Sequence, residues 1–414
     1  MKTLAVLTLS FLALLSIHAA DTVDASSLRG KVLCGYQGWF RCPGDAQNAG
    51  WIHWSRDGKR IAPETLTFEM WPDLTDFPDV ERFTAPGFSG PDGRPAQLFS
   101  SDNAATVRRH FEWMRDYGID GVWLQHFLVD FPEGPAKNRY ASRLRVLNHV
   151  RQAAQATGRV WALTYDVSGM TSDKIFDAIV ADWKKQVDDG VTRDDRYVHQ
   201  NGKPVLQIFG FYHGGGGSNM TLECANRLVD FLKAPGPYSA FVAGGGDWNW
   251  RRKSAPEWLA LYRRLDAYSP WNTGNTSEDP AGVVHATTNY WAADKADFDA
   301  RGALWIPVVY PGFSWDNLQK KKPGETGISR RDGAFLWEQF YALSMLGADS
   351  VFVAMFDEVD EGTAIFKVTS TPPTQAHFQT FGKLPSDGYL WLVGEATKRL
   401  HAHQPIPDAM PSRP

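Results

Sequence analysis

Short apolar segments alternate with amphipathic helical segments along most of this 414-residue chain. A segment is expected to be a strand where it is short, rich in β-branched and aromatic residues, and bounded by turn residues. Eight segments meet this description: residues 31–36, 120–125, 159–165, 204–209, 240–243, 267–269, 304–310 and 350–356. Strands that alternate with helices in this way predict an α/β fold, a single (β/α)8 TIM-type barrel with long loops at the C-terminal face of the strands.

The clearest helix is expected to begin at the cap Ser101-Asp102 and to end at Gly118. Other helical patterns cover residues 140–156, 172–189, 222–232, 256–264 and 331–346. The main alternative is a doubly wound open sheet, which normally carries a glycine-rich phosphate-binding turn after an early strand. The chain has no such turn, which favours the barrel.

Four carboxylates follow the last predicted strand directly, at Asp357, Glu358, Asp360 and Glu361. A buried strand that ends in this way directs like charges to one place. Their repulsion and partial burial raise the pKa of at least one carboxyl group, as acid–base work near neutral pH requires. The alternative is an ordinary acidic loop at the surface.

Glu358 and Glu361 stand three residues apart, so their side chains are expected on one side of a turn. Hydrolysis of a glycosidic bond needs two such groups, one to protonate the leaving oxygen and one to attack or stabilise the anomeric centre. Together with Asp357 and Asp360 they could instead bind a divalent cation, since Ca²⁺ favours clustered carboxylates. Their spacing matches no metal-binding loop motif, which argues against a metal site.

Candidate substrate-binding residues lie at the predicted strand ends and in aromatic loops. The chain holds 17 Trp, and aromatic faces stack well on the apolar faces of sugar rings. These candidates are His53, Trp54, Gln125, His126, Tyr165, Asp166, Trp248, Trp271, Tyr310 and Trp315, together with Asp357 and Asp360. For any one Trp a core position is the alternative, and for His126 a structural role.

Composition narrows the classes of partner and the compartment. The formal net charge is −4, without the basic stripe that nucleic-acid binding needs. Lys2 and the apolar run 4–17 predict a signal peptide over residues 1–20, with an alternative end at residue 25, and a secreted or periplasmic protein. No later apolar run is long enough to span a membrane. Residues 28–405 are expected to form the one catalytic domain.

Three cysteines, at positions 34, 42 and 224, leave two alternatives open. In an exported protein Cys34 and Cys42 could close a small loop, or all three could be buried thiols.

The segment from Phe356 to Thr363 resembles the N-E-W-H-E-G-T signature of glycoside hydrolase family 99, the endo-acting α-mannosidases and α-mannanases. The segment Trp51-Ile52-His53-Trp54 resembles an aromatic-His-Trp segment of the same family. The segment RRDGAFLW (330–337) resembles the Arg-containing helix that precedes the last strand of that family. The strings GYQGWF (35–40), EMWPD (69–73) and YPGFSWDNL (310–318) are similar to a secreted branch related to families 71 and 99, often labelled xylosidase/arabinosidase.

This resemblance implies a (β/α)8 barrel and a retaining mechanism through a 1,2-anhydro sugar intermediate, and it implies no metal or organic cofactor. It implies that Glu358 deprotonates the 2-hydroxyl of the substrate and that Glu361 protonates the leaving oxygen and then activates water. Asp357 stands where the signature has Asn, and Val359-Asp360 where it has Trp-His. The alternatives are a non-catalytic glycan-binding barrel and a calcium-dependent surface protein.

Overall fold

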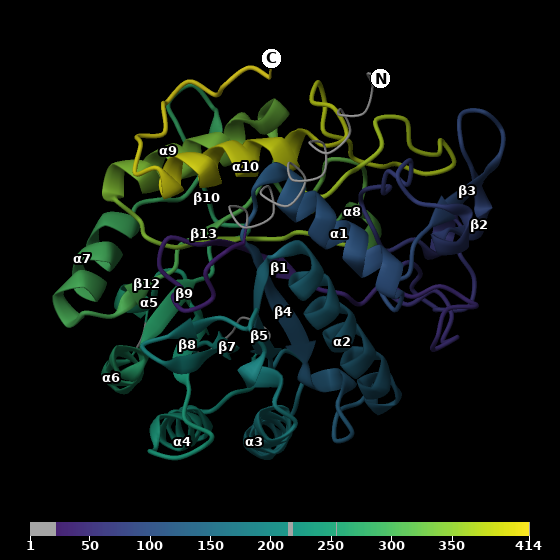
Figure 1. Cartoon of the computed structure of the whole chain (residues 1–414). Helices are drawn as coiled ribbons and strands as arrows, with labels where there is room; N and C mark the ends of the chain where they lie inside the picture. Colours follow the sequence, from purple (N-terminus) through teal and green to yellow (C-terminus); the bar gives the residue numbers. More distant parts are fainter. Residues whose placement is uncertain (1–21, 214–217, 254, 414) are drawn as a thin grey trace, which may run out of the picture.

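Parallel strands wrapped by helices form the centre of the molecule (Figure 1). The computed structural model describes residues 22–213, 218–253 and 255–413, so the predicted signal peptide of residues 1–20 lies outside the described residues. The strands of the barrel are β1 (Val32–Tyr36), β4 (Gly121–Phe127), β5 (Val160–Asp166), β7 (Lys203–Phe211), β8 (Phe241–Gly246), β9 (Ala267–Pro270), β12 (Leu304–Trp305), β13 (Val308–Val309) and β14 (Val351–Val353). They correspond to the eight segments expected from the sequence.

One segment closes the barrel. Strands β12 and β13 belong to a single stretch of chain, residues 304–309. At its start Leu304 pairs with Ala267 of β9, and at its end Val308 pairs with Phe352 of β14. The remaining neighbours follow in the order β9, β8, β7, β5, β4, β1, β14. The chain therefore has the predicted (β/α)8 barrel rather than an open sheet.

Eight helices alternate with these strands and cover the outside of the barrel: α1 (Ala104–Tyr117), α2 (Tyr140–Thr157), α3 (Ser172–Asp188), α4 (Leu222–Lys233), α6 (Pro256–Arg264), α7 (Trp291–Arg301), α9 (Ala334–Leu346) and α10 (Gly388–His401). The sequence patterns did not identify α7 and α10. The predicted cap of α1 was wrong, because Asn103 accepts the hydrogen bond from the Ala105 N–H. Asp102 instead accepts hydrogen bonds from Arg145 and Ser142, which ties the start of α1 to α2.

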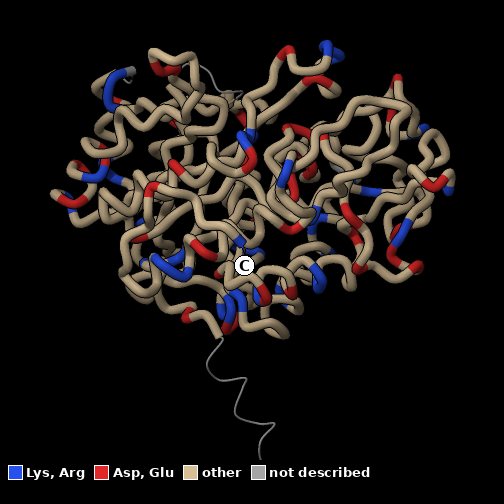
Figure 2. The backbone as a smooth tube through the Cα atoms, turned by 90° about the horizontal axis from the view of Figure 1, so that it is seen from above, with Lys and Arg blue, Asp and Glu red and all other residues tan. Residues whose placement is uncertain are grey.

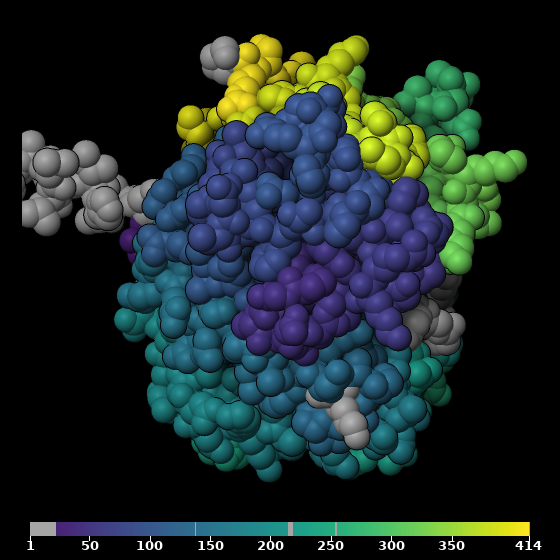
Figure 3. Space-filling view, turned by 90° about the vertical axis from the view of Figure 1, so that its right-hand side faces the viewer, coloured from purple at the N-terminus to yellow at the C-terminus, as the bar shows by residue number. Residues whose placement is uncertain are grey.

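The other elements lie in the loops between strands and helices. Two hairpins, β2 (Phe83–Ser89) with β3 (Pro95–Leu98) and β10 (Thr276–Glu278) with β11 (Val284–Ala286), are antiparallel, as is the pairing of β6 (His199–Gln200) with β7. Helices α5 (Trp250–Lys253) and α8 (Asp316–Gln319) are short. The 3-10 helices are η1 (Pro63–Thr65), η2 (Asp79–Glu81), η3 (Leu128–Asp130), η4 (Lys137–Arg139), η5 (Val191–Arg193) and η6 (Arg331–Gly333). The long segment between β1 and α1 covers the centre of the face seen in Figure 3.

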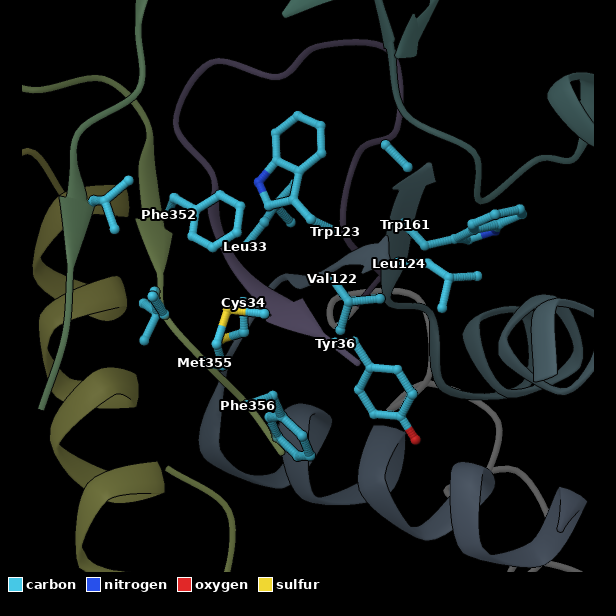
Figure 4. Packing of buried hydrophobic residues seen from close by; sticks show 14 of the residues in the cluster. Leu33, Cys34, Tyr36, Val122, Trp123, Leu124, Trp161, Phe352, Met355 and Phe356 are labelled. Carbon is cyan, nitrogen blue, oxygen red and sulfur yellow. The ribbon is translucent and has the colours of Figure 1, made fainter. Parts of the chain in front are cut away.

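Alternate residues of each strand point to opposite sides of the barrel wall. Trp123 of β4 and Phe352 of β14 stack inside the barrel with ring centroids 6.2 Å apart (Figure 4). Tyr36 points the other way, where its hydroxyl hydrogen-bonds Nδ1 of His110 on α1 at 2.9 Å. This alternation decides which side chains at the strand ends can reach the mouth of the barrel.

All three cysteines are free and buried, which supports the second of the two alternatives for them. Positions of lysine and arginine and positions of aspartate and glutamate are interspersed along the backbone in Figure 2. Among the described residues, no helix is both long and apolar enough to cross a bilayer.

Helix α10 packs so closely on the end of α1 that a methyl group at Gly394 would lie 1.9 Å from the Tyr117 carbonyl oxygen. Alanine normally favours a helix over glycine by about 1 kcal/mol. We predict that Gly394→Ala instead lowers the free energy of unfolding by about 1–3 kcal/mol, because the two helices must separate. Urea denaturation measures this change. Gly327→Ala is the matched control, since its methyl group would meet nothing closer than 3.8 Å; equal effects of the two variants would contradict the prediction.

Candidate active site

The acidic segment that follows β14 is fastened to the loop that follows β1. Asp357 is fully buried, and its two carboxylate oxygens accept the backbone N–H groups of Gln37 at 2.7 Å and Gly38 at 2.9 Å. Burial raises the pKa of Asp357 to about 6, although these two hydrogen bonds act in the opposite direction. Because both oxygens are engaged by the backbone, Asp357 anchors the loop, and the prediction that it binds substrate is corrected.

Glu358 lies directly beside this anchor and is 1% exposed. Its Oε2 accepts a hydrogen bond from Nε2 of Gln37 at 2.5 Å, and its Oε1 accepts the backbone N–H of Asp360 at 3.0 Å. Burial, and then the charges of Asp360, Glu361 and Asp357, raise the pKa of Glu358 well above its usual value. The side chain therefore has a fixed orientation and a strong tendency to hold a proton.

Glu361 is the member of the pair that solvent reaches, since it is only partly buried. Burial raises its pKa to about 7, a hydrogen bond from the Trp315 indole acts to lower it, and the charge of Asp166 raises it. Its backbone carbonyl accepts the N–H of Ser314 at 2.9 Å, which joins the loops after β13 and β14. A carboxyl group that titrates near pH 7 at the mouth of the barrel is suited to general acid and base catalysis.

Asp360 points to a different neighbour. Its Oδ2 is 2.9 Å from Nδ1 of His53, and its Oδ1 is buried without a hydrogen-bond partner. The His53 ring is stacked on Trp39, with centroids 3.8 Å apart and planes inclined by 6°, and Trp39 in turn contacts Phe127 at 4.8 Å. The predicted site residues His53 and Asp360 are thus in direct contact, which their separation in the sequence did not indicate.

Glu69 is a buried carboxyl group of this region that the sequence analysis missed as a site residue. It accepts hydrogen bonds from Ser314 Oγ at 2.9 Å and from the Asn317 backbone N–H at 2.6 Å. Burial raises its pKa to about 7, and its charge raises the pKa of Asp360 in turn. The only sequence signal was its place in the EMWPD string.

Side chains on the inner side of the barrel wall form the surroundings of the glutamate pair. Gln125 lies two residues after Trp123 on β4, so its side chain also points to the inside of the barrel. Asp166 is the last residue of β5, and burial raises its pKa to about 6. Phe209 of β7 and Trp271 after β9 are both partly exposed and lie 4.9 Å apart, edge to face. Tyr212 was also missed from the sequence; burial raises its pKa, and the nearby charges of Asp166 and Glu361 act in the same direction.

Three predicted substrate contacts point away from this interior. The hydroxyl of Tyr165 donates to Asp182 of α3 at 2.6 Å, and Nδ1 of His126 lies 3.8 Å from the same carboxylate. Tyr310 donates to the Asn275 carbonyl at 2.9 Å and packs edge to face on Phe335 of α9. All three belong to the layer between strands and helices, so their assignment to substrate binding is corrected.

Trp54 is corrected for a different reason, because it is a core residue. Its indole donates to the Phe99 carbonyl at 3.1 Å, and it packs against Phe40 and Phe68 with no exposed area. Trp315, by contrast, is 38% exposed beside Glu361. Trp248 is partly exposed and lies against Tyr290 at 5.2 Å.

The carboxylates after β14 do not form a metal-binding cage. Within residues 22–213, 218–253 and 255–413, no group of three or more His, Cys, Asp and Glu side chains is arranged to hold a metal ion. Asp357 and Glu358 both accept N–H donors, which a cation in the same place would have to displace. The calcium alternative therefore has no support in this geometry.

The fold can be compared with known proteins. Two solved structures of the GH99 endo-alpha-mannosidase from Bacteroides thetaiotaomicron are similar to this chain, one of them in complex with Bis-Tris propane. For that complex the TM-score is 0.66 at 16% identity over 91% of this chain and 99% of the other. For the second structure the TM-score is 0.64 at 15% identity, with the same coverage. No protein-family model and no curated protein sequence matches the chain. The resemblance indicated by the motifs is confirmed at the level of the fold.

The buried carboxyl of Glu69 gives a pH-dependent test of this geometry. Its pKa is about 7 in the folded protein against 4.5 for an ordinary Glu. Below pH 4.5 both states hold the proton, so the full stability is present. Between pH 4.5 and 7 only the unfolded chain loses its proton, and stability falls as the pH rises. We predict that Glu69→Gln removes about 3 kcal/mol of this decline between pH 4.5 and 8.

The measurement is the free energy of unfolding in urea across that pH range. The control is Glu257→Gln, since Glu257 is exposed on α6 and its replacement leaves the slope unchanged. A Glu69→Gln protein with the pH slope of the wild type would contradict the prediction.

Proposed function

We propose that the protein is a retaining glycoside hydrolase that cleaves a polysaccharide or glycan with Glu358 and Glu361. The observation that carries this proposal is the contrast between the two glutamates. Glu361 is partly exposed and has a pKa of about 7, whereas Glu358 is buried and held in place by two N–H donors. Two carboxyl groups with different environments at one strand end can divide acid and base roles between them.

Glu361 acts as the general acid and then as the general base. Near neutral pH its carboxyl group is present in both protonation states, so it can donate a proton to the leaving oxygen and afterwards accept one from water. Its partial exposure gives that water a route to the reaction centre. Asp166 supports the acid form, because its negative charge raises the pKa of Glu361.

Glu358 acts as the base on the 2-hydroxyl of the sugar, which then attacks the anomeric carbon to give a 1,2-anhydro intermediate. Burial and the neighbouring charges raise the pKa of Glu358, and the hydrogen bonds from Gln37 and from the Asp360 N–H act in the opposite direction, toward the charged form that this step requires. Water opens the intermediate with the help of Glu361, and two inversions leave the anomeric configuration unchanged.

The substrate is a carbohydrate held by aromatic and polar side chains at the mouth of the barrel. Trp271, Phe209 and Trp315 present partly exposed rings for stacking on sugar faces. The retained substrate-contact candidates from the sequence are Gln125, Asp166, Trp248, Trp271 and Trp315, whereas His53 and Asp360 contact each other. We also propose that residues 28–405 are the catalytic domain and that the signal segment directs secretion or periplasmic export.

The test is an assay of released reducing sugar on α-mannans, α-glucans, xylans and arabinans with the purified mature protein. On the responsive glycan, Glu361→Gln and Glu358→Gln each lower kcat/KM by at least about a hundredfold, since each removes a group that transfers a proton in the transition state. The rate falls as the pH rises through about 7, because Glu361 loses the proton that it donates. Full activity of both variants on every responsive glycan would refute these roles.

A second candidate is a glycan-binding protein that keeps the barrel but does not hydrolyse its ligand. The observation that favours it is the burial of Glu358, which is 1% exposed and would have to be uncovered by the substrate. This candidate predicts a rise in Tm with a glycan, unchanged by both Gln substitutions, and no release of reducing ends by any of the proteins.

A further inference from the structure

Two loops that are far apart in the sequence meet beside Glu358. One follows β1 and carries Gln37, Trp39 and His53; the other follows β14 and carries the acidic segment. We propose that His53 and Asp360 are a positioning pair that holds the Glu358 carboxylate in its working orientation. This inference rests on the proposed hydrolase function and assigns a role to Asp360, one of the three residues at which the chain departs from the N-E-W-H-E-G-T signature.

Asp360 joins His53 to Glu358 through two different atoms. Its backbone N–H donates to Oε1 of Glu358 at 3.0 Å, and its carboxyl Oδ2 is 2.9 Å from Nδ1 of His53. The side-chain contact fixes the rotation of Asp360 and hence the direction of its N–H group. With Gln37 holding Oε2, the Glu358 carboxylate is then fixed at both oxygens.

His53 is itself held firmly enough to serve as an anchor. Its ring is stacked on Trp39 at 3.8 Å, and its carbonyl accepts a hydrogen bond from Thr67 Oγ1 at 2.6 Å. Its backbone has φ of 64°, in the left-handed region that residues other than glycine seldom occupy. Such a conformation persists where the surrounding contacts determine it, and it is frequent at functional sites.

The charges around the pair favour a neutral contact rather than an ion pair. Burial lowers the pKa of His53 well below its usual value, and the nearby Arg143, Arg139 and Arg41 lower it further. Burial raises the pKa of Asp360 well above its usual value, and the charges of Glu361, Glu69 and Asp357 act in the same direction. Both effects favour a neutral carboxyl group on Asp360 and a neutral His53 ring. The Asp360 carboxyl group then holds the shared proton and donates a hydrogen bond to Nδ1 of His53.

A neutral Asp360 matters for the glutamate beside it. Glu358 lies near Asp360, Glu361 and Asp357, and a negative charge on any of the three raises its pKa. An ionised Asp360 would raise that pKa further and oppose formation of the base, whereas a protonated Asp360 adds a hydrogen-bond donor without adding charge. The pair therefore positions Glu358 and at the same time removes one negative charge from its surroundings.

The test compares Asp360→Ala, His53→Ala, the double variant and Asp360→Asn in the full mature protein. Because the pair acts through Glu358, each alanine variant lowers kcat by about a hundredfold with little change in KM, as a misplaced catalytic group does. The double variant is no slower than either single one, since both remove the same contact. Asp360→Asn restores most of the rate, because its amide N–H can donate to Nδ1 and it carries no charge.

The pH profile separates positioning from a general structural role. At low pH, kcat/KM falls because the base Glu358 becomes protonated. In Asp360→Asn this fall occurs at the same pH as in the wild type, because a neutral amide replaces a neutral carboxyl group. A fall that moves to lower pH would mean that Asp360 is ionised in the wild type, and it would overturn the neutral pair. Additive losses in the double variant, or alanine variants within about threefold of the wild type, would overturn the positioning role.

A measurement that needs no substrate keeps this inference distinct from the hydrolase proposal. Long-range ¹H–¹⁵N NMR spectra show which imidazole nitrogen carries hydrogen, and the His53 signal is assigned by its loss in His53→Ala. We expect a neutral ring with hydrogen on Nε2 only, from pH 6 to pH 8, and a changed ring in Asp360→Ala. A protonated ring, or one unaffected by Asp360→Ala, would overturn the pair even if the protein proved to hydrolyse glycans. If no glycan is cleaved, the hydrolase proposal fails while the NMR result still decides the contact.

Discussion

The pairing of residues 304–309 with two different strands is the constraint on which the rest of the structure depends. Leu304 is in register with Ala267 of β9, and Val308 is in register with Phe352 of β14. This one segment converts a curved parallel sheet into a closed ring, which leaves no unpaired edge. Within this ring β14 pairs directly with β1, so the acidic segment that follows β14 faces Gln37 and Gly38 rather than solvent.

The buried carboxyl groups around the acidic segment can lie close together because most of them have their own hydrogen-bond partners. Asp357 is held by backbone N–H groups, Glu69 by Ser314 and Asn317, and Asp360 by His53. Their burial raises each pKa, so several can hold protons near neutral pH and the local charge is smaller than the sequence implies. Glu361 alone of this segment keeps access to solvent and a pKa of about 7, which makes it the natural proton donor.

The aromatic residues divide into two groups that the sequence does not separate. Trp54 and Tyr310 complete the core, whereas Trp271 and Trp315 keep exposed rings near the glutamates. Strand alternation explains much of this division, since neighbours such as Tyr165 and Asp166 face opposite sides of the wall. A prediction that takes every polar or aromatic residue at a strand end is therefore expected to assign about half of them to the wrong side.

By itself the sequence determined the fold, because eight short apolar segments alternating with helices leave few arrangements other than the barrel. It also located Glu358 and Glu361 behind the last strand, since the hydrophobic pattern ends abruptly at Asp357. Only the tertiary structure decided which carboxyl group faces solvent, that Gln37 and Glu69 belong to the site, and that His53 contacts Asp360 across 307 positions of the chain. The physical reason is that periodicity is a local property of the chain, whereas burial and hydrogen-bond partners, which set each pKa, arise only when the closed barrel brings distant loops together.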